Sequence, residues 1–96
     1  TYYYFFMQDR KEKILHFKKI VGKLVRQLRE NKQTSGNKLA NEYDLYSGNL
    51  SRLENGETDP QFSTIWKTAE ALGIKFSEFA KMIEDELGDE FTLIDI

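Results

Sequence analysis

The longest periodic pattern in the chain lies near its N-terminus. Between Arg10 and Asn31 apolar residues recur at steps of three and four, with lysine and arginine between them. This spacing places the apolar side chains on one face of an α-helix. The members of the stripe are Ile14, Phe17, Val21, Leu24, Val25 and Leu28. The pattern predicts a long amphipathic helix over residues 10–31.

Two short helices are predicted next, over residues 36–43 and 47–54. Ser35 can cap the first, because its hydroxyl accepts a hydrogen bond from a free backbone amide of the first turn. Residues 44–46 are expected to form a tight turn, and Gly56 ends the second short helix because glycine adopts the left-handed conformation without steric cost. The expected buried residues are Leu39, Ala40, Tyr43, Leu50 and Leu53.

Two further helices complete the pattern. Asp59-Pro60 is expected to open the fourth, which Gly73 closes, and Ser77 is expected to cap the fifth, which ends at Gly88. Their apolar stripes are Phe62, Ile65, Ala69 and Leu72, then Phe79, Ile83 and Leu87. Trp66, Tyr43 and Tyr46 are expected in the core or at its edge.

The expected fold is therefore all-α, with one domain over residues 10–88 and short tails at 1–9 and 89–96. Within the tails, 2–6 and 91–96 are β-prone or irregular segments. Leaving both in water would create aggregation-prone edges. We expect them to be covered in a homodimer whose contact is formed by the C-terminal region, with or without the N-terminal tail, on the stripe of the fifth helix. The alternative is that both tails fold back on their own monomer or remain disordered.

Composition narrows the chemistry. The chain has 96 residues, no cysteine and a single histidine, His16, so thiolate and histidine metal sites are not expected. The sequence holds no Ser/His/Asp, phosphate-loop or paired-carboxylate arrangement, which predicts a protein that is not an enzyme and needs no cofactor. No apolar stretch is long enough to span a bilayer and no signal peptide is evident, so we expect no membrane partner and a cytoplasmic location.

Charge is distributed unevenly along the chain. The formal net charge is -2, but residues 1–34 carry nine basic and three acidic side chains, whereas residues 35–96 carry five basic and thirteen acidic ones. Such asymmetry indicates one end that tolerates a polyanion and another that faces away from it.

Two short helices joined by a turn need a surrounding bundle to hold their mutual angle. Residues 28–72 resemble the helix-turn-helix domain of the Cro and phage-repressor (Xre-like) family. The similar segments are Ser51-Arg52-Leu53-Glu54-Asn55-Gly56 and Thr64-Ile65-Trp66-Lys67-Thr68-Ala69-Glu70-Ala71-Leu72-Gly73. The resemblance implies a five-helix, lambda-repressor-like bundle that binds double-stranded DNA as a homodimer and regulates transcription as a repressor.

The family places its second short helix in the major groove, where base edges are distinguishable. A helical wheel puts a slim polar face opposite Leu50 and Leu53. The expected base-contacting residues are Ser47, Gly48, Asn49, Ser51 and Arg52. Phosphate contacts are expected at the start of the first short helix and around it, from Lys32, Thr34, Ser35, Lys38 and Asn55.

Glu54 lies about 70° from the centre of the buried stripe on the wheel, too far inward for a free surface carboxylate. The family resemblance places Arg29 opposite Glu54, so we expect a buried or half-buried ion pair between them.

A second interpretation remains open. The sequence pI of 5.4 and the acidic loop residues Glu57 and Asp59 favour a protein-interaction adaptor that keeps the bundle and binds DNA weakly or not at all. Gly36 favours it too, because it stands where family members usually have a glutamine that touches DNA. An antitoxin that represses its own operon is also compatible with the sequence.

Overall fold

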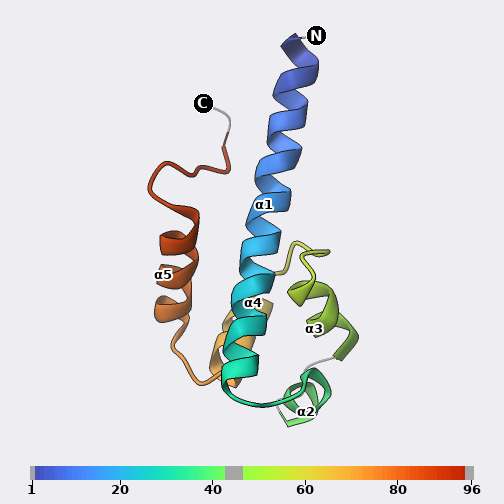
Figure 1. The fold of residues 1–96 in the computed structure, drawn as a ribbon, viewed down its shortest axis with the longest axis vertical. Helices are drawn as coiled ribbons and strands as arrows, with labels where there is room; N and C mark the ends of the chain where they lie inside the picture. Colours follow the sequence, from blue (N-terminus) through green and yellow to red (C-terminus); the bar gives the residue numbers. More distant parts are fainter. Residues whose placement is uncertain (1, 43–46, 95–96) are drawn as a thin grey trace.

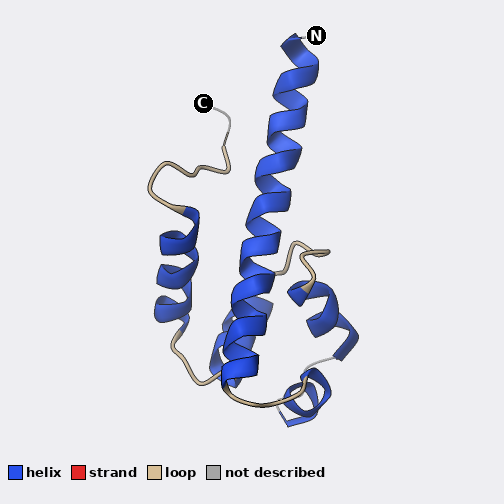
Figure 2. Cartoon of the chain, in the orientation of Figure 1, coloured by secondary structure: helices blue, strands red, loops and turns tan. Residues whose placement is uncertain are grey.

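The computed structural model describes residues 2–42 and 47–94 of the chain. Its helices are α1 (Tyr2–Asn31), α2 (Gly36–Glu42), α3 (Ser47–Glu54), α4 (Phe62–Ala71) and α5 (Phe76–Leu87). Helix α1 forms the long axis, with α5 along one side, α2 and α3 on the other, and α4 behind it (Figure 1). Figure 2 shows helices and loops alone over the described residues, so the predicted all-α, five-helix fold is confirmed.

The core forms around the C-terminal half of α1. Val21 and Val25 are fully buried there, and the other helices pack apolar residues against them. These residues are Leu24, Leu39, Leu50, Leu53, Ala69, Ala71, Leu72 and Phe79. Each large apolar side chain buried in this way contributes roughly 1.5–3 kcal/mol. The predicted burial of Leu39, Ala40, Leu50 and Leu53 is confirmed.

Several predicted helix ends are also confirmed. The backbone N–H of Lys38 donates to Ser35 Oγ at 3.1 Å, which is the expected cap of α2. Helix α3 ends at Glu54, and Gly56 follows it with a φ of 72°, in the left-handed region. The N–H of Gly56 donates to the Leu53 carbonyl at 3.1 Å, and that of Glu57 donates to the Arg52 carbonyl at 2.9 Å, which satisfies the last carbonyls of the helix.

Two predicted helix starts were wrong. Helix α4 begins at Phe62 rather than Pro60, because Gln61, between them, has an extended backbone and forms the N-cap. Helix α5 begins before Ser77, since the N–H of Lys75 donates to Glu78 Oε1 at 3.4 Å and so moves the cap two residues upstream.

The N-terminal segment was predicted as a β-prone tail, and this was wrong. Helix α1 starts at Tyr2 and continues without a break to Asn31. Extending an existing helix adds one hydrogen bond for each residue fixed, whereas a strand needs a partner strand to pair with. No glycine or proline interrupts residues 2–21, so helix extension is the available solution.

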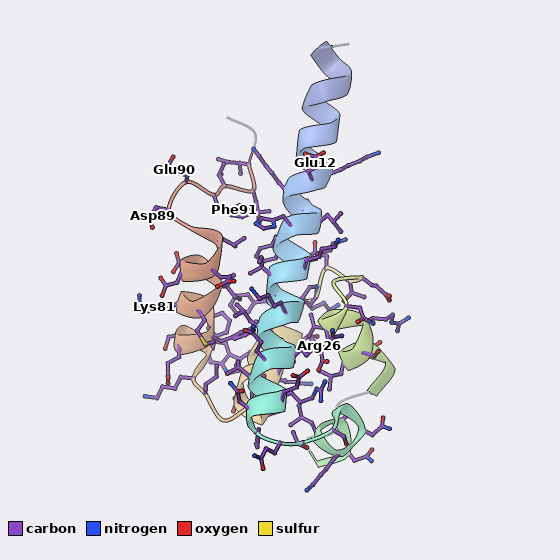
Figure 3. The ribbon with its side chains drawn as sticks, in the orientation of Figure 1. Glu12, Arg26, Lys81, Asp89, Glu90 and Phe91 are labelled. Atoms are coloured by element: carbon purple, nitrogen blue, oxygen red, sulfur yellow. The ribbon has the colours of Figure 1, made fainter. Side chains whose placement is uncertain are left out.

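The C-terminal tail folds back along α1. The Phe91 ring packs edge-on against His16, with 6.1 Å between ring centroids, and Figure 3 shows Phe91 facing α1. Lys13 Nζ donates to the Ile94 carbonyl at 3.3 Å. The Phe79 side chain of α5 is fully buried within the same chain. Of the apolar stripe that we expected to face a second copy, Phe79 is therefore covered by its own chain, whereas Ile83 and Leu87 are half-buried.

One predicted core aromatic is also misplaced. Phe62 was expected on the buried stripe of α4, but its side chain is 67% exposed, and Trp66 is 46% exposed. The expected turn over residues 44–46, with Tyr43 and Tyr46, lies outside the described residues. Within the part of the chain that the structure describes, no helix is long and apolar enough to cross a membrane.

Candidate nucleic-acid interface

Helices α2 and α3 pack against each other through the buried side chains of Leu39 and Leu50 and present a polar outer face. Asn49, Ser51 and Arg52 are exposed on α3, and Gly48 is half-buried beside them. An Arg52 guanidinium N–H donates to Asn49 Oδ1 at 2.6 Å, which holds the arginine along the helix surface. Ser47 is the first residue of α3, and its side chain lies outside the described set.

The predicted phosphate-contacting residues divide into two groups. Thr34, Ser35 and Lys38 lie together at the start of α2, where the Ser35 hydroxyl accepts the helix-capping bond. Lys32 Nζ instead donates to the Ala71 carbonyl at 2.9 Å, at the C-terminal end of α4. Asn55 Oδ1 accepts a hydrogen bond of 2.6 Å from Arg26.

The expected contact between Arg29 and Glu54 is present. Arg29 Nε lies 2.7 Å from Glu54 Oε2, and a terminal guanidinium nitrogen lies 3.0 Å from Oε1, so the contact is bidentate. The Glu54 side chain is 6% exposed. The hydrogen bond that Arg29 donates to Glu54 raises the pKa of Arg29, and partial burial opposes that rise. Arg29 also donates to the Thr34 carbonyl at 3.0 Å, which ties the turn before α2 to the same carboxylate.

Sequence reasoning missed a second arginine at this carboxylate. Arg26 Nε lies 3.3 Å from Glu54 Oε1, and the same guanidinium holds Asn55. Figure 3 shows Arg26 between α1 and α3. The signal was present in the sequence, because residues 26 and 29 are three apart and share one face of α1.

The approach of α1 to α3 also depends on Gly22, which the sequence analysis did not single out. A Cβ added at this position would overlap the Leu53 carbonyl oxygen and would lie 2.6 Å from the Glu54 carbonyl oxygen. Gly56 faces α1 in the same way, since an added Cβ would lie 3.0 Å from the Lys19 Cα. The two backbones therefore meet where only glycine fits.

One face of α1 thus holds the C-terminal end of α3. Lys19, Gly22, Arg26 and Arg29 recur at steps of three and four and all contact this end. Because exposed carbonyls give a helix C-terminus a partial negative charge, the basic residues complement it. These contacts with α1 fix the angle of α3 on the side opposite its polar face, and they leave that polar face uncovered.

The comparisons with known proteins agree with this geometry. Residues 25–79 match the model of the helix-turn-helix family HTH_3, which covers more than half of the chain. The chain therefore belongs to this helix-turn-helix family, which confirms the family expected from the sequence. No curated protein matches the chain.

Two solved structures share the fold. A crystal structure of the clp gene regulator ClgR from C. glutamicum has a TM-score of 0.67 at 20% identity, covering 77% of this chain and 96% of that one. An HTH_3 family transcriptional regulator from Vibrio cholerae has a TM-score of 0.68 at 27% identity, covering 80% of this chain. The match spans only 43% of the Vibrio cholerae chain.

Proposed function

We propose that this chain is a transcriptional repressor that binds double-stranded DNA sequence-specifically, with the outer face of α3 in the major groove. The observation that carries the proposal is the polar, exposed face of α3 on a helix whose opposite side is fixed by Glu54, Arg26 and Arg29. A rigid helix with an uncovered polar face can align side chains with base edges. The family match supports the same class, as do the two similar structures, a clp gene regulator and an HTH_3 family transcriptional regulator.

Arg52 is the base-reading residue in this proposal, with Ser47, Gly48, Asn49 and Ser51 around it. A guanidinium can bind the O6 and N7 of guanine in a bidentate contact, which discriminates by roughly 1–3 kcal/mol. The bond from Arg52 to Asn49 is at the surface, so a base edge can replace it at little cost.

Phosphate contacts supply affinity without sequence information. We assign them to Lys38 with Thr34 and Ser35, which lie together at the start of α2. Lys32 and Asn55 are weaker candidates for phosphate contacts, because their side chains already form hydrogen bonds within the protein. Lys32 donates to the Ala71 carbonyl, and Asn55 accepts from Arg26.

A single module of this size covers roughly 600–1,000 Å² on DNA, and a second half-site supplies added affinity and specificity. The proposal therefore includes a homodimer that binds two half-sites one helical turn apart.

The test begins with selection of a preferred site from random duplex DNA, followed by binding to a set of single-base variants of that site. Arg52→Ala should flatten the differences among the variants, while Lys38→Ala should weaken all duplexes about equally and lower the salt slope by about one. Lys81→Ala is the matched control, since Lys81 is an exposed lysine on α5 that pairs with Asp85 on the same helix.

Uniform loss in both variants would reject the assigned roles. Failure to enrich any site would reject sequence-specific binding and favour the adaptor, for which affinity should also vary little with salt.

A further inference from the structure

Helices α4 and α5 share an exposed aromatic cluster, formed by Phe62, Trp66 and Phe76. The Trp66 and Phe76 rings stack with 4.8 Å between centroids and 6° between planes, and Phe62 lies 4.9 Å from Phe76. Phe62 is 67% exposed and Trp66 46% exposed, although both belong to residue types that dominate buried cores. A cluster of large apolar side chains left in water marks a contact surface.

The surface around the cluster is shaped for an inserted side chain. One hollow beside Trp66 is lined by residues of the α4–α5 loop, including Ile74 and Lys75. A second hollow is lined by Phe76 together with Phe62, Pro60 and Ile83. Projecting rings beside two hollows form a surface that can interlock with an identical one, as an isologous contact requires.

We infer that the aromatic cluster is the contact between two copies of this chain. The charges around the cluster favour a second copy of the chain as its partner, because Lys75 lines the same hollow as Glu70 and Glu78. In a two-fold contact each patch meets itself, so a patch of one sign would repel its copy, whereas this patch can pair Lys75 with a carboxylate across the axis.

The position of the cluster suits the proposed two-half-site binding, on which this part of the inference rests. Figure 1 shows α3 on the opposite side of α1 from α5, so a contact through the cluster leaves α3 uncovered.

The test measures self-association of the full chain without DNA. Sedimentation velocity should show conversion from monomer to dimer at micromolar concentration or below. Trp66 is the single tryptophan of the chain, so its fluorescence emission should shift to longer wavelength on dilution as the cluster returns to water. A dimer whose formation leaves the Trp66 emission unchanged uses another surface and overturns the inference, as does a monomer at all concentrations.

Matched variants separate the cluster from general apolar exposure. Phe62→Ala and Trp66→Ala should each weaken dimerisation by at least about 30-fold, the loss expected for an interface hot spot. The controls are Ile94→Ala and Leu15→Ala, whose side chains are 65% and 47% exposed at the other end of the molecule and should leave dimerisation unchanged. Equal loss in the controls, or dimerisation by Phe62→Ala as strong as in the wild type, overturns the inference.

Folding and DNA binding are checked separately. If Trp66→Ala does not unfold cooperatively, Phe62→Ala and its Ile94→Ala control decide the outcome, because Phe62 is mostly exposed. A duplex with one half-site distinguishes the two proposals. Phe62→Ala should keep the base preference of the wild type there, while a dimeric wild type without base preference would reject the DNA-binding proposal and leave the dimer contact standing.

Discussion

The contact of α1 with α3 and the contact of α4 with α5 differ in which side chains they bury and which they leave exposed. At the first, Glu54 is nearly buried and its carboxylate is held by Arg26 and Arg29. At the second, Phe62 is 67% exposed and Trp66 is 46% exposed. The molecule thus buries charge where one helix must be held at a defined angle, and exposes aromatic surface where none of the described elements covers it.

This difference indicates separate roles for the two regions. A buried carboxylate is costly unless its partners are correctly placed, so the α1–α3 contact tolerates few alternative geometries. Apolar contacts are less directional, and an aromatic cluster can accept a second surface without changing the fold that carries it.

The largest expected effect is at Glu54. Glu54→Ala should lower the free energy of unfolding by about 3–5 kcal/mol, because it leaves the partly buried Arg29 without its carboxylate partner. Urea denaturation monitored by circular dichroism measures the change. An unchanged midpoint would show that the ion pair does not stabilise the α1–α3 contact.

A smaller loss is expected at Gly22. Gly22→Ala should destabilise the protein by about 1–3 kcal/mol, because the new Cβ overlaps backbone carbonyl oxygens of α3 that cannot move independently. The control is Gly36→Ala, where the nearest atom to the added Cβ, Leu50 Cδ2, is 3.9 Å away. Gly36→Ala should be neutral or stabilising by up to about 1 kcal/mol. Equal effects at the two glycines would reject the close approach of α1 and α3.

The smallest effect is expected in the aromatic cluster. Phe62→Ala should change the stability of the monomer by no more than about 0.5 kcal/mol, because the side chain is mostly in water. Measurement at high dilution keeps dimerisation from contributing. A loss of several kcal/mol would show that the cluster belongs to the core, and would remove the contrast between the two regions.

The sequence by itself determined most of the helix-turn-helix. The period of the apolar residues placed Leu39, Ala40, Leu50 and Leu53 in the core, and Ser35 and Gly56 marked helix ends. These signals are local, since a cap and an amphipathic face depend on residues within a few turns of one another. The wheel position of Glu54 also located the carboxylate correctly, although only the family resemblance supplied Arg29 as its partner.

The tertiary structure decided the features that depend on distant neighbours. Phe62 matches the apolar stripe of α4, but its exposure depends on whether another helix covers that end of the stripe, and none does among the described residues. Residues 2–6 have β-prone side chains, yet α1 extends through them, since residues 2–42 and 47–94 offer no strand to pair with. Gly22 appears in the sequence as an ordinary glycine within a helix. Only the crossing of α3, whose carbonyl oxygens occupy the space of a Cβ, gives this position its requirement for glycine.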